Sequence, residues 1–211
     1  MLSHSIVRIT LPVVLLMSVV YLIASEAEAT LVEPVAKNDR ARISRIQPSQ
    51  YGGQAFQIVY RVPVPIHVYW RFKTDFNGDF QTSNKYIRSH RLVAQSANVA
   101  ITENKYANAP DVKFQWKTTV TASDFHLAYV LLNPKSCGQK FQFGRIEAAP
   151  DGPFTRVVHR IYFDFFGAFF WAHLPGPGGM RDFLRYTARW EQMTVLRLKK
   201  RYGRPGSEAA R

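Results

Sequence analysis

Two ionisable residues lie on faces that are otherwise apolar, and these are the best placed for chemistry. His159 lies between Val157 and Ile161 at every second position of an expected strand, which puts it on the apolar face of that strand. Glu191 lies on the apolar face of an expected helix. In a mostly apolar pocket such groups orient a ligand carbonyl or hydroxyl. The alternatives are a hydrogen-bonded core histidine and a carboxylate paired with Arg160 or another basic residue.

Two further residues carry reactive groups but have less favourable surroundings. Asp75 lies near the end of a short expected helix, where it is either a general base or an acceptor for the following turn. Cys137 stands beside Gly138 in an expected turn with no histidine next to it in sequence, which favours an incidental thiol over a nucleophile. Because Cys137 is the single cysteine, an intramolecular disulfide and a multi-cysteine metal site are excluded.

Recognisable catalytic motifs are missing from the sequence. It has no phosphate-binding glycine loop after a strand, no His-Glu-x-x-His and no nucleophile elbow. The six histidines are scattered without the spacing of metal ligands. The glycines of residues 176–179 precede a helix, where their amides could meet an anion, but a simple helix start explains them as well. We therefore predict no catalytic residue, no metal and no cofactor.

An aromatic stretch at residues 162–174 is the most unusual local feature. Alternation explains one aromatic face but not the whole cluster, which has two interpretations. One is core and cavity wall. The other is a cavity mouth that docks on a membrane beside basic residues. Both can hold, because one face can lie inside and the other outside. The residues expected to contact a membrane are Phe166, Phe169, Phe170 and Trp171.

A long helix near the C-terminus organises the expected fold. From Met180 to Tyr202, apolar residues recur at spacings of three and four, which places them on one face. The breaker run at residues 175–179 precedes this pattern, and Gly203 and Pro205 follow it. A single helix over Met180–Tyr202 is therefore predicted.

Almost everything before this helix has the period of a strand. A short helix is expected at Ile66–Phe76, and a weaker second one around Gln81–Asn84. The order of elements predicts an α+β fold in which one antiparallel sheet packs against the long helix. The expected strands are Phe56–Val62, Tyr86–Ala94, Asn98–Ala107, Lys113–Ala122, Phe125–Asn133, Lys140–Ala148 and Phe154–Phe166.

The N-terminus has the pattern of an export signal. An apolar run at Ile9–Ala24 is followed by Ala27-Glu28-Ala29, which predicts a signal peptide over residues 1–29; an uncleaved anchor is the alternative. Residues 30–53 are expected to be a linker ordered only in part, and residues 204–211 a disordered tail. Lys and Arg outnumber Asp and Glu by 28 to 15, which favours anionic partners. Export makes a membrane surface a better partner than nucleic acid, and predicts a periplasmic or extracellular, membrane-associated protein.

The approach to the short helix resembles a known superfamily. Val62-Pro63-Val64-Pro65-Ile66, followed by Trp70-Arg71-Phe72-Lys73-Thr74-Asp75-Phe76, is similar to the opening of SRPBCC proteins, which include START lipid-transfer domains, polyketide cyclases and coenzyme Q-binding proteins. The last strand, the glycine-rich run and the terminal helix also resemble that group, over residues 54–203. The resemblance implies a helix-grip fold, in which a seven-stranded curved sheet wraps around the C-terminal helix and leaves an apolar cavity.

The combined expectation is an exported, monomeric binder or carrier of a hydrophobic ligand such as a lipid, sterol or polyprenoid-like molecule. One alternative is a cyclase- or aromatase-type enzyme, which would need two ionisable groups converging in the cavity, with His159, Glu191 and Asp75 the first candidates. The other is an envelope interaction protein whose cavity is filled by side chains. Strand alternation and helix phase predict these lining residues: Trp116, Tyr129, Phe143, His159, Phe163, Leu184, Ala188 and Glu191.

Overall fold

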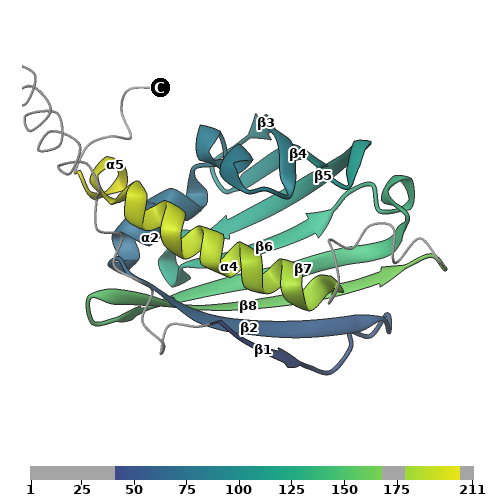
Figure 1. Ribbon diagram of the computed structural model, residues 1–211, viewed down its shortest axis with the longest axis horizontal. Helices are drawn as coiled ribbons and strands as arrows, with labels where there is room; N and C mark the ends of the chain where they lie inside the picture. Colours follow the sequence, from purple (N-terminus) through teal and green to yellow (C-terminus); the bar gives the residue numbers. More distant parts are fainter. Residues whose placement is uncertain (1–40, 168–178, 205–211) are drawn as a thin grey trace, which may run out of the picture. The chain divides into compact units, whose positions relative to one another are not determined.

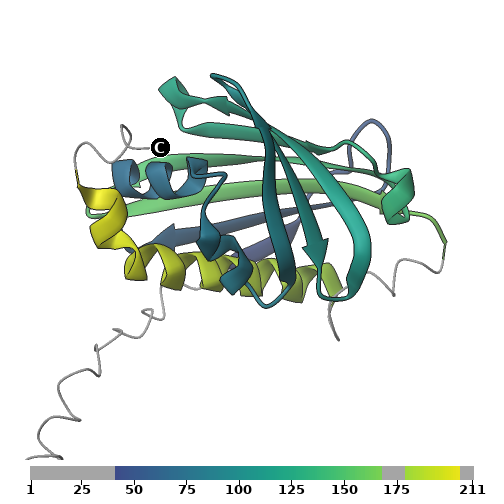
Figure 2. The same ribbon diagram turned by 90° about the horizontal axis from the view of Figure 1, so that it is seen from above.

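The computed structural model describes residues 41–167 and 179–204. Within them, one antiparallel sheet of eight strands has the order β1-β2-β8-β7-β6-β5-β4-β3 (Figure 1). The long helix α4 lies along the concave side of this sheet (Figure 2). The strands are β1 (Arg42–Arg45), β2 (Gln54–Val62), β3 (Ile87–Gln95), β4 (Val99–Tyr106), β5 (Ala109–Thr121), β6 (His126–Leu131), β7 (Gln139–Asp151) and β8 (Phe154–Phe165). The helices are α2 (Ile66–Thr74), η2 (Asp79–Ser83), η3 (Ala122–Asp124), η4 (Lys135–Cys137), α4 (Gly179–Arg197) and α5 (Lys199–Gly203).

The α+β helix-grip architecture expected from the sequence is confirmed, with one strand more than expected. The additional strand, β1, lies in the stretch interpreted as a linker and pairs with β2 from Arg42↔Val59 to Arg45↔Phe56. Its sequence, Arg-Ile-Ser-Arg, has no apolar alternation, because an edge strand needs only backbone pairing and can leave its side chains in water. Side-chain pattern therefore could not predict it.

Strand β5 begins at Ala109, before the start expected at Lys113. Tyr106 pairs with Ala109, and the register then shifts so that Asn104 pairs with Phe114. Pro110 lies inside this irregularity, where β4 requires no amide hydrogen from it. The expected start at Lys113 was therefore too late.

Helix α4 has the expected inward face but ends before the expected helix does. Its buried residues include Met180, Leu184, Ala188 and Glu191. The helical backbone is interrupted at Leu198, where ψ is 6°, and resumes as α5. The change of direction lets Tyr202 pack on Phe72 and Phe80 and donate a 2.7 Å hydrogen bond to Asp75. Tertiary packing therefore divides a segment whose sequence pattern predicts one continuous helix.

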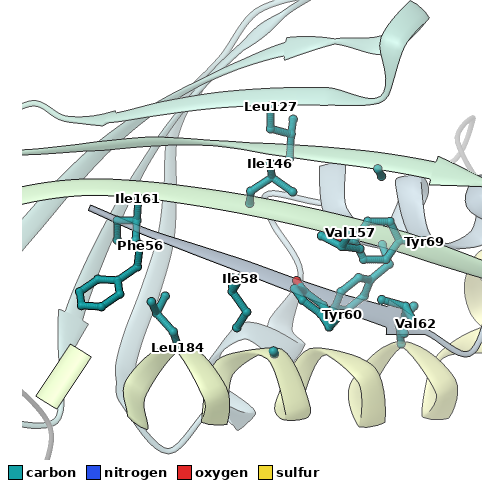
Figure 3. Close-up of a cluster of buried hydrophobic side chains, with 14 of the residues drawn as sticks. Phe56, Ile58, Tyr60, Val62, Tyr69, Leu127, Ile146, Val157, Ile161 and Leu184 are labelled. Carbon is teal, nitrogen blue, oxygen red and sulfur yellow. The ribbon is translucent and has the colours of Figure 1, made fainter. Parts of the chain in front are cut away.

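The main core lies between α4, α2 and the central strands. It is built from alternate residues of β2 and β8, such as Ile58, Tyr60 and Val157, against Leu184 of α4 and Tyr69 of α2 (Figure 3). The period of two in the strands and of three to four in the helix therefore converge on one apolar layer. Among the described residues, no helix combines the length and the apolarity that crossing a bilayer requires.

Phe72 provides a direct test of this core. Its side chain is 2% exposed and contacts Tyr69, Phe80, Trp190 and Tyr202, so it joins all the helices at one end of the sheet. Phe72→Ala is expected to lower the free energy of unfolding by about 3–5 kcal/mol in urea denaturation. Phe166→Ala is the matched control: this side chain is 42% exposed, and its loss should cost under about 0.5 kcal/mol. Equal effects of the two changes would contradict the assigned core.

Candidate ligand-binding cavity

A cavity of about 240 Å³ lies between the concave face of the sheet and α4. A smaller chamber of about 70 Å³ adjoins it, and the two share Tyr106, Trp116, Gln142 and Phe183. Aromatic and aliphatic side chains make most of the wall. The ionisable residues on the wall of the larger chamber are Lys73, His90, Tyr106, Tyr129, His159 and Glu191.

Of the eight predicted lining residues, five lie on the cavity wall, two lie in the packed core, and Phe143 lies on the opposite face of the sheet. Those that line the larger chamber are Trp116, Tyr129, His159, Leu184 and Glu191. Phe163 and Ala188 are 0% and 2% exposed and lie in the packed core, outside the cavity wall. The structure gives the positions of these residues, and their role in binding a ligand stays a prediction.

Phe143 lies on the opposite face of the sheet, so its expected inward orientation is wrong. It stacks on Tyr162 and contacts Phe141 and Tyr51, a side chain that is 66% exposed. The register of β7 shifts between Gln139 and Phe141, which reverses the faces on which the following residues lie. Gln142 lines the cavity in its place.

The Glu191 carboxylate is the buried centre of the cavity wall. One oxygen accepts hydrogen bonds from the hydroxyls of Tyr60 at 2.8 Å and Tyr69 at 2.5 Å. The other oxygen forms an ion pair with Lys73 Nζ at 2.5 Å. The expectation that a basic residue pairs with Glu191 is confirmed, but the partner is Lys73 and not Arg160. Arg160 bonds to Gln57 and Glu147 instead.

Charge and hydrogen bonding decide the protonation states in this group. Burial by itself would raise the pKa of Glu191, but the Lys73 ammonium and the two tyrosine hydroxyls outweigh it and hold that pKa below its usual value. Burial and the nearby carboxylate raise the pKa of both Tyr60 and Tyr69. At neutral pH Glu191 is therefore an ionised carboxylate, and the two tyrosines that donate to it are neutral.

His159 and Tyr129 form a second polar pair on the wall. The Tyr129 hydroxyl and His159 Nε2 share a hydrogen bond at 2.6 Å. Burial, reinforced by the charge of Lys73, lowers the pKa of His159 to about 3, so the imidazole is neutral. Tyr129 occupies Nε2, and among the described residues no hydrogen bond joins Nδ1 to another side chain. Gly144 makes room for the pair: a Cβ there would lie 2.4 Å from the Tyr129 hydroxyl.

Sequence reasoning missed several polar residues of the wall, among them Lys73 and His90. Lys73 comes from α2, where it follows Phe72 in a stretch interpreted by its apolar period alone. His90 comes from the edge strand β3, and its ring nitrogens lie 2.7 Å from Asn104 Oδ1 and 2.8 Å from the carbonyl of Phe76. Neither had a sequence signal, because only the curvature of the sheet and the helix packing bring them to the cavity.

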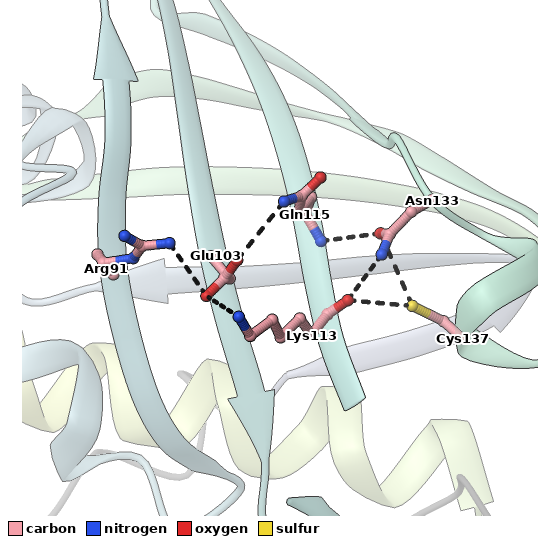
Figure 4. Close-up of polar contacts among 6 residues, drawn as sticks. All are labelled: Arg91, Glu103, Lys113, Gln115, Asn133 and Cys137. Carbon is pink, nitrogen blue, oxygen red and sulfur yellow. Dashed lines mark hydrogen bonds and ion pairs between the residues drawn. The ribbon is translucent and has the colours of Figure 1, made fainter. Parts of the chain in front are cut away.

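Asp75 and Cys137 lie away from the cavity wall. Asp75 accepts from Tyr202 and pairs with Arg201 at 3.4 Å, which ties α2 to α5. Cys137 is 1% exposed, and burial raises the pKa of its thiol to about 11. The thiol points at the Lys113 carbonyl and Asn133, beside the ion pairs of Glu103 on the neighbouring strand (Figure 4). These contacts give both residues structural roles.

Of the predicted membrane contacts, only Phe166 lies within the described residues. It is 42% exposed at the end of β8. Phe169, Phe170 and Trp171 lie outside the described residues. Within residues 41–167 and 179–204, no three His, Cys, Asp or Glu side chains cluster as metal ligands would.

Solved structures with the same arrangement support the fold. The Zhui aromatase/cyclase from Streptomyces sp. R1128 superposes with a TM-score of 0.54 at 15% identity, over 79% of this chain and 99% of that one. A START superfamily protein from Mycobacterium smegmatis gives 0.51 at 15% identity, over 68% and 98%. This chain has the START-like helix-grip fold.

The START-like fold is also that of a plant enzyme. Norcoclaurine synthase from Thalictrum flavum superposes with a TM-score of 0.50 at 10% identity, over 75% of this chain and 90% of that one. No family model and no curated protein sequence matches the chain. At such identities the similarity carries the architecture only.

The Lys73–Glu191 pair makes a prediction about stability and pH. Lys73→Met leaves a buried carboxylate without its cation and should lower the free energy of unfolding by about 3 kcal/mol at neutral pH. Without Lys73, burial raises the pKa of Glu191, so folding takes up a proton. The loss should therefore shrink as the pH falls to about 4.

Urea denaturation at both pH values measures this effect. The double variant Lys73→Met/Glu191→Gln is the control, because it leaves no unpaired charge and should recover part of the stability. A loss in Lys73→Met that is the same at both pH values would contradict the buried ion pair.

Proposed function

We propose that this protein binds a small, mainly apolar ligand in the cavity between the sheet and α4. The observation that carries the proposal is the cavity itself, about 240 Å³ in volume, with an apolar wall and a few fixed polar groups. A natural protein interior closes such spaces, since lost contacts cost free energy in proportion to the cavity volume. The interaction-protein alternative required a filled cavity and is not favoured.

The volume restricts the size of the ligand. An engineered cavity of about 150 Å³ holds one benzene molecule, so this one suits a compound of one or two rings or a short branched chain. Burial of such a body contributes about 0.8 kcal/mol for each methylene-sized group. A whole phospholipid exceeds this space, which narrows the lipid carrier expected from the sequence to a binder of smaller compounds.

The polar groups orient one end of the ligand. The Lys73 ammonium donates to Glu191 alone among the described residues, and it lines the cavity with two further N–H groups. His159 Nδ1 is a second polar atom for the ligand, because Tyr129 occupies the other ring nitrogen. The Lys73 donor suits a carbonyl or carboxylate oxygen of the ligand.

An enzyme of cyclase type is the second candidate, and the convergence of Lys73, Glu191 and His159 favours it. The ammonium could polarise a carbonyl, as acid catalysis on such a scaffold requires. Glu191 is a poor base, because it accepts three hydrogen bonds and its pKa is lowered. The neutral His159 imidazole has one of its two ring nitrogens engaged by Tyr129. Because Glu191 and His159 are already hydrogen-bonded within the protein, neither is well placed to act as a base, and binding is the better supported function.

Export remains part of the proposal. Residues 1–29 have the pattern of a cleaved signal peptide, and an exported binder would meet small apolar compounds at the cell envelope. Expression of the full chain followed by N-terminal sequencing of the secreted form should give Thr30 as the first residue. A product that retains Met1 and stays with the membrane fraction would support the anchor instead.

Filling the cavity tests the binding function. Thr118 lines the larger chamber on β5, and Thr119, the next residue, is not part of the wall. Thr118→Trp should abolish uptake of one- and two-ring compounds, measured by native mass spectrometry and calorimetry, because the indole occupies the space. Thr119→Trp is the matched control and should bind like the wild type.

Two results would argue against simple binding. Uptake that survives in Thr118→Trp would place the ligand elsewhere. A compound released in chemically altered form would favour the enzyme.

A further inference from the structure

The face of the sheet that points away from α4 carries exposed apolar side chains. Five large apolar side chains are exposed among residues 41–167 and 179–204, and three of them, Tyr51, Val130 and Leu132, lie together on this face. Phe143, which stacks on Tyr162 there, lies directly opposite Val130 in the β6–β7 ladder. A gathering of this kind on a surface marks a site of interaction more often than chance.

Ring contacts and strand register join these side chains into one continuous patch. Tyr51, in the turn between β1 and β2, contacts Phe141 and Phe143 with 5.9 and 6.3 Å between ring centroids. Leu132 follows Val130 by two residues, and its amide continues the pairing with β5, so it lies on the same face. We call these residues the outer patch: Tyr51, Val130, Leu132, Phe141, Phe143 and Tyr162.

Basic residues surround the outer patch. Lys117 is exposed directly opposite Val130 on β5, and no described acidic residue pairs with it. The carboxylates on this face are already paired: Glu103 with Arg91 and Lys113 (Figure 4), Glu147 with Arg145 and Arg160, and Asp164 with Lys140. Six basic groups therefore meet three carboxylates, and the excess positive charge favours an anionic partner.

Two kinds of partner fit this face poorly. A single-stranded nucleic acid needs open ring faces on which its bases stack. Phe143 and Tyr162 instead cover each other, with 5.1 Å between ring centroids and 16° between their planes. A second copy of the chain would bring the same positive charges together, which opposes a symmetric dimer.

An anionic lipid surface matches the face in both respects. Tyrosine is typical of the boundary between water and hydrocarbon, because its ring is apolar and its hydroxyl polar. Basic side chains beside it are attracted to anionic head groups, which are mobile and require no fixed set of contacts.

We propose that the outer patch docks on an anionic membrane surface. Tyr51, Val130 and Leu132 enter the head-group region, and Lys117 and its basic neighbours contact the lipid phosphates. The proposal goes beyond the binding function, because the cavity lies on the other face of the sheet.

A fluorescent label beside Tyr51 tests whether this face enters the bilayer. Because Cys137 is buried and its thiol has a pKa raised to about 11, a cysteine introduced at an exposed position takes up the label selectively. Gln50→Cys in the full chain carries an environment-sensitive dye next to the patch. Ser123→Cys, exposed in η3 at the far end of β6 from Leu132, is the matched control.

The vesicles contain phosphatidylcholine, either alone or mixed with the anionic phosphatidylglycerol. On the mixed vesicles, the dye at position 50 should shift its emission to the blue and be quenched by nitroxide-labelled lipids. The dye at position 123 should do neither, and phosphatidylcholine alone should leave both dyes unchanged.

Removal of one charge tests the electrostatic part of the proposal. Lys117→Gln should weaken binding to the mixed vesicles about fivefold in a flotation assay, since it removes one cation that lies near the head groups. Lys200→Gln is the matched control, because it removes an equal charge from α5 and should bind like the wild type.

Three results would overturn the proposal. If the protein floats with vesicles while the dye at position 50 stays in water, another segment docks. Equal losses in Lys117→Gln and Lys200→Gln would mean that net charge alone attracts the protein. A full chain that binds neither kind of vesicle rules out a lipid surface and leaves an acidic protein as the partner to seek. None of these results concerns the cavity, whose function is judged separately by Thr118→Trp.

Discussion

The burial of one carboxylate is the constraint on which the rest of this structure depends. Glu191 is 1% exposed, and an ionised group can remain there only because Lys73, Tyr60 and Tyr69 satisfy it. Its partners come from β2 and α2, while Glu191 belongs to α4. The network therefore fixes the long helix against the sheet at one depth and one rotation. Hydrophobic packing alone would specify that position less strictly, since apolar contacts have no direction.

The same network explains how a cavity can persist beside a well-packed core. Toward β2 and β8, Leu184 and Val157 pack in the main core (Figure 3). Toward β3–β5, the sheet curves over α4 (Figure 2), and side chains from these strands and from α4 line the cavity. The polar groups lie along the wall as two hydrogen-bonded pairs, Lys73 with Glu191 and Tyr129 with His159. A rigid polar wall beside an open apolar space is an arrangement suited to orienting a ligand.

Sequence reasoning predicted the elements well where burial alternates along the chain and less well where it does not. The strands around His159 and the inward face of α4 follow from periods of two and of three to four. β1 was missed because a short edge strand needs no apolar pattern. Phe143 was assigned to the wrong face because a register shift reverses the alternation within β7. Lys73 was missed because a lysine after Phe72 has no signal that it turns inward.

The sequence by itself determined the class of the fold, the long terminal helix and the two ionisable residues on apolar faces, His159 and Glu191. These follow from local periodicity, which a single chain displays without knowledge of its neighbours. Only the tertiary structure decided the partners of those residues and the break at Leu198. Such features depend on contacts between separate segments, such as that of Tyr69 with Glu191, 122 residues further along the chain, which no local pattern encodes.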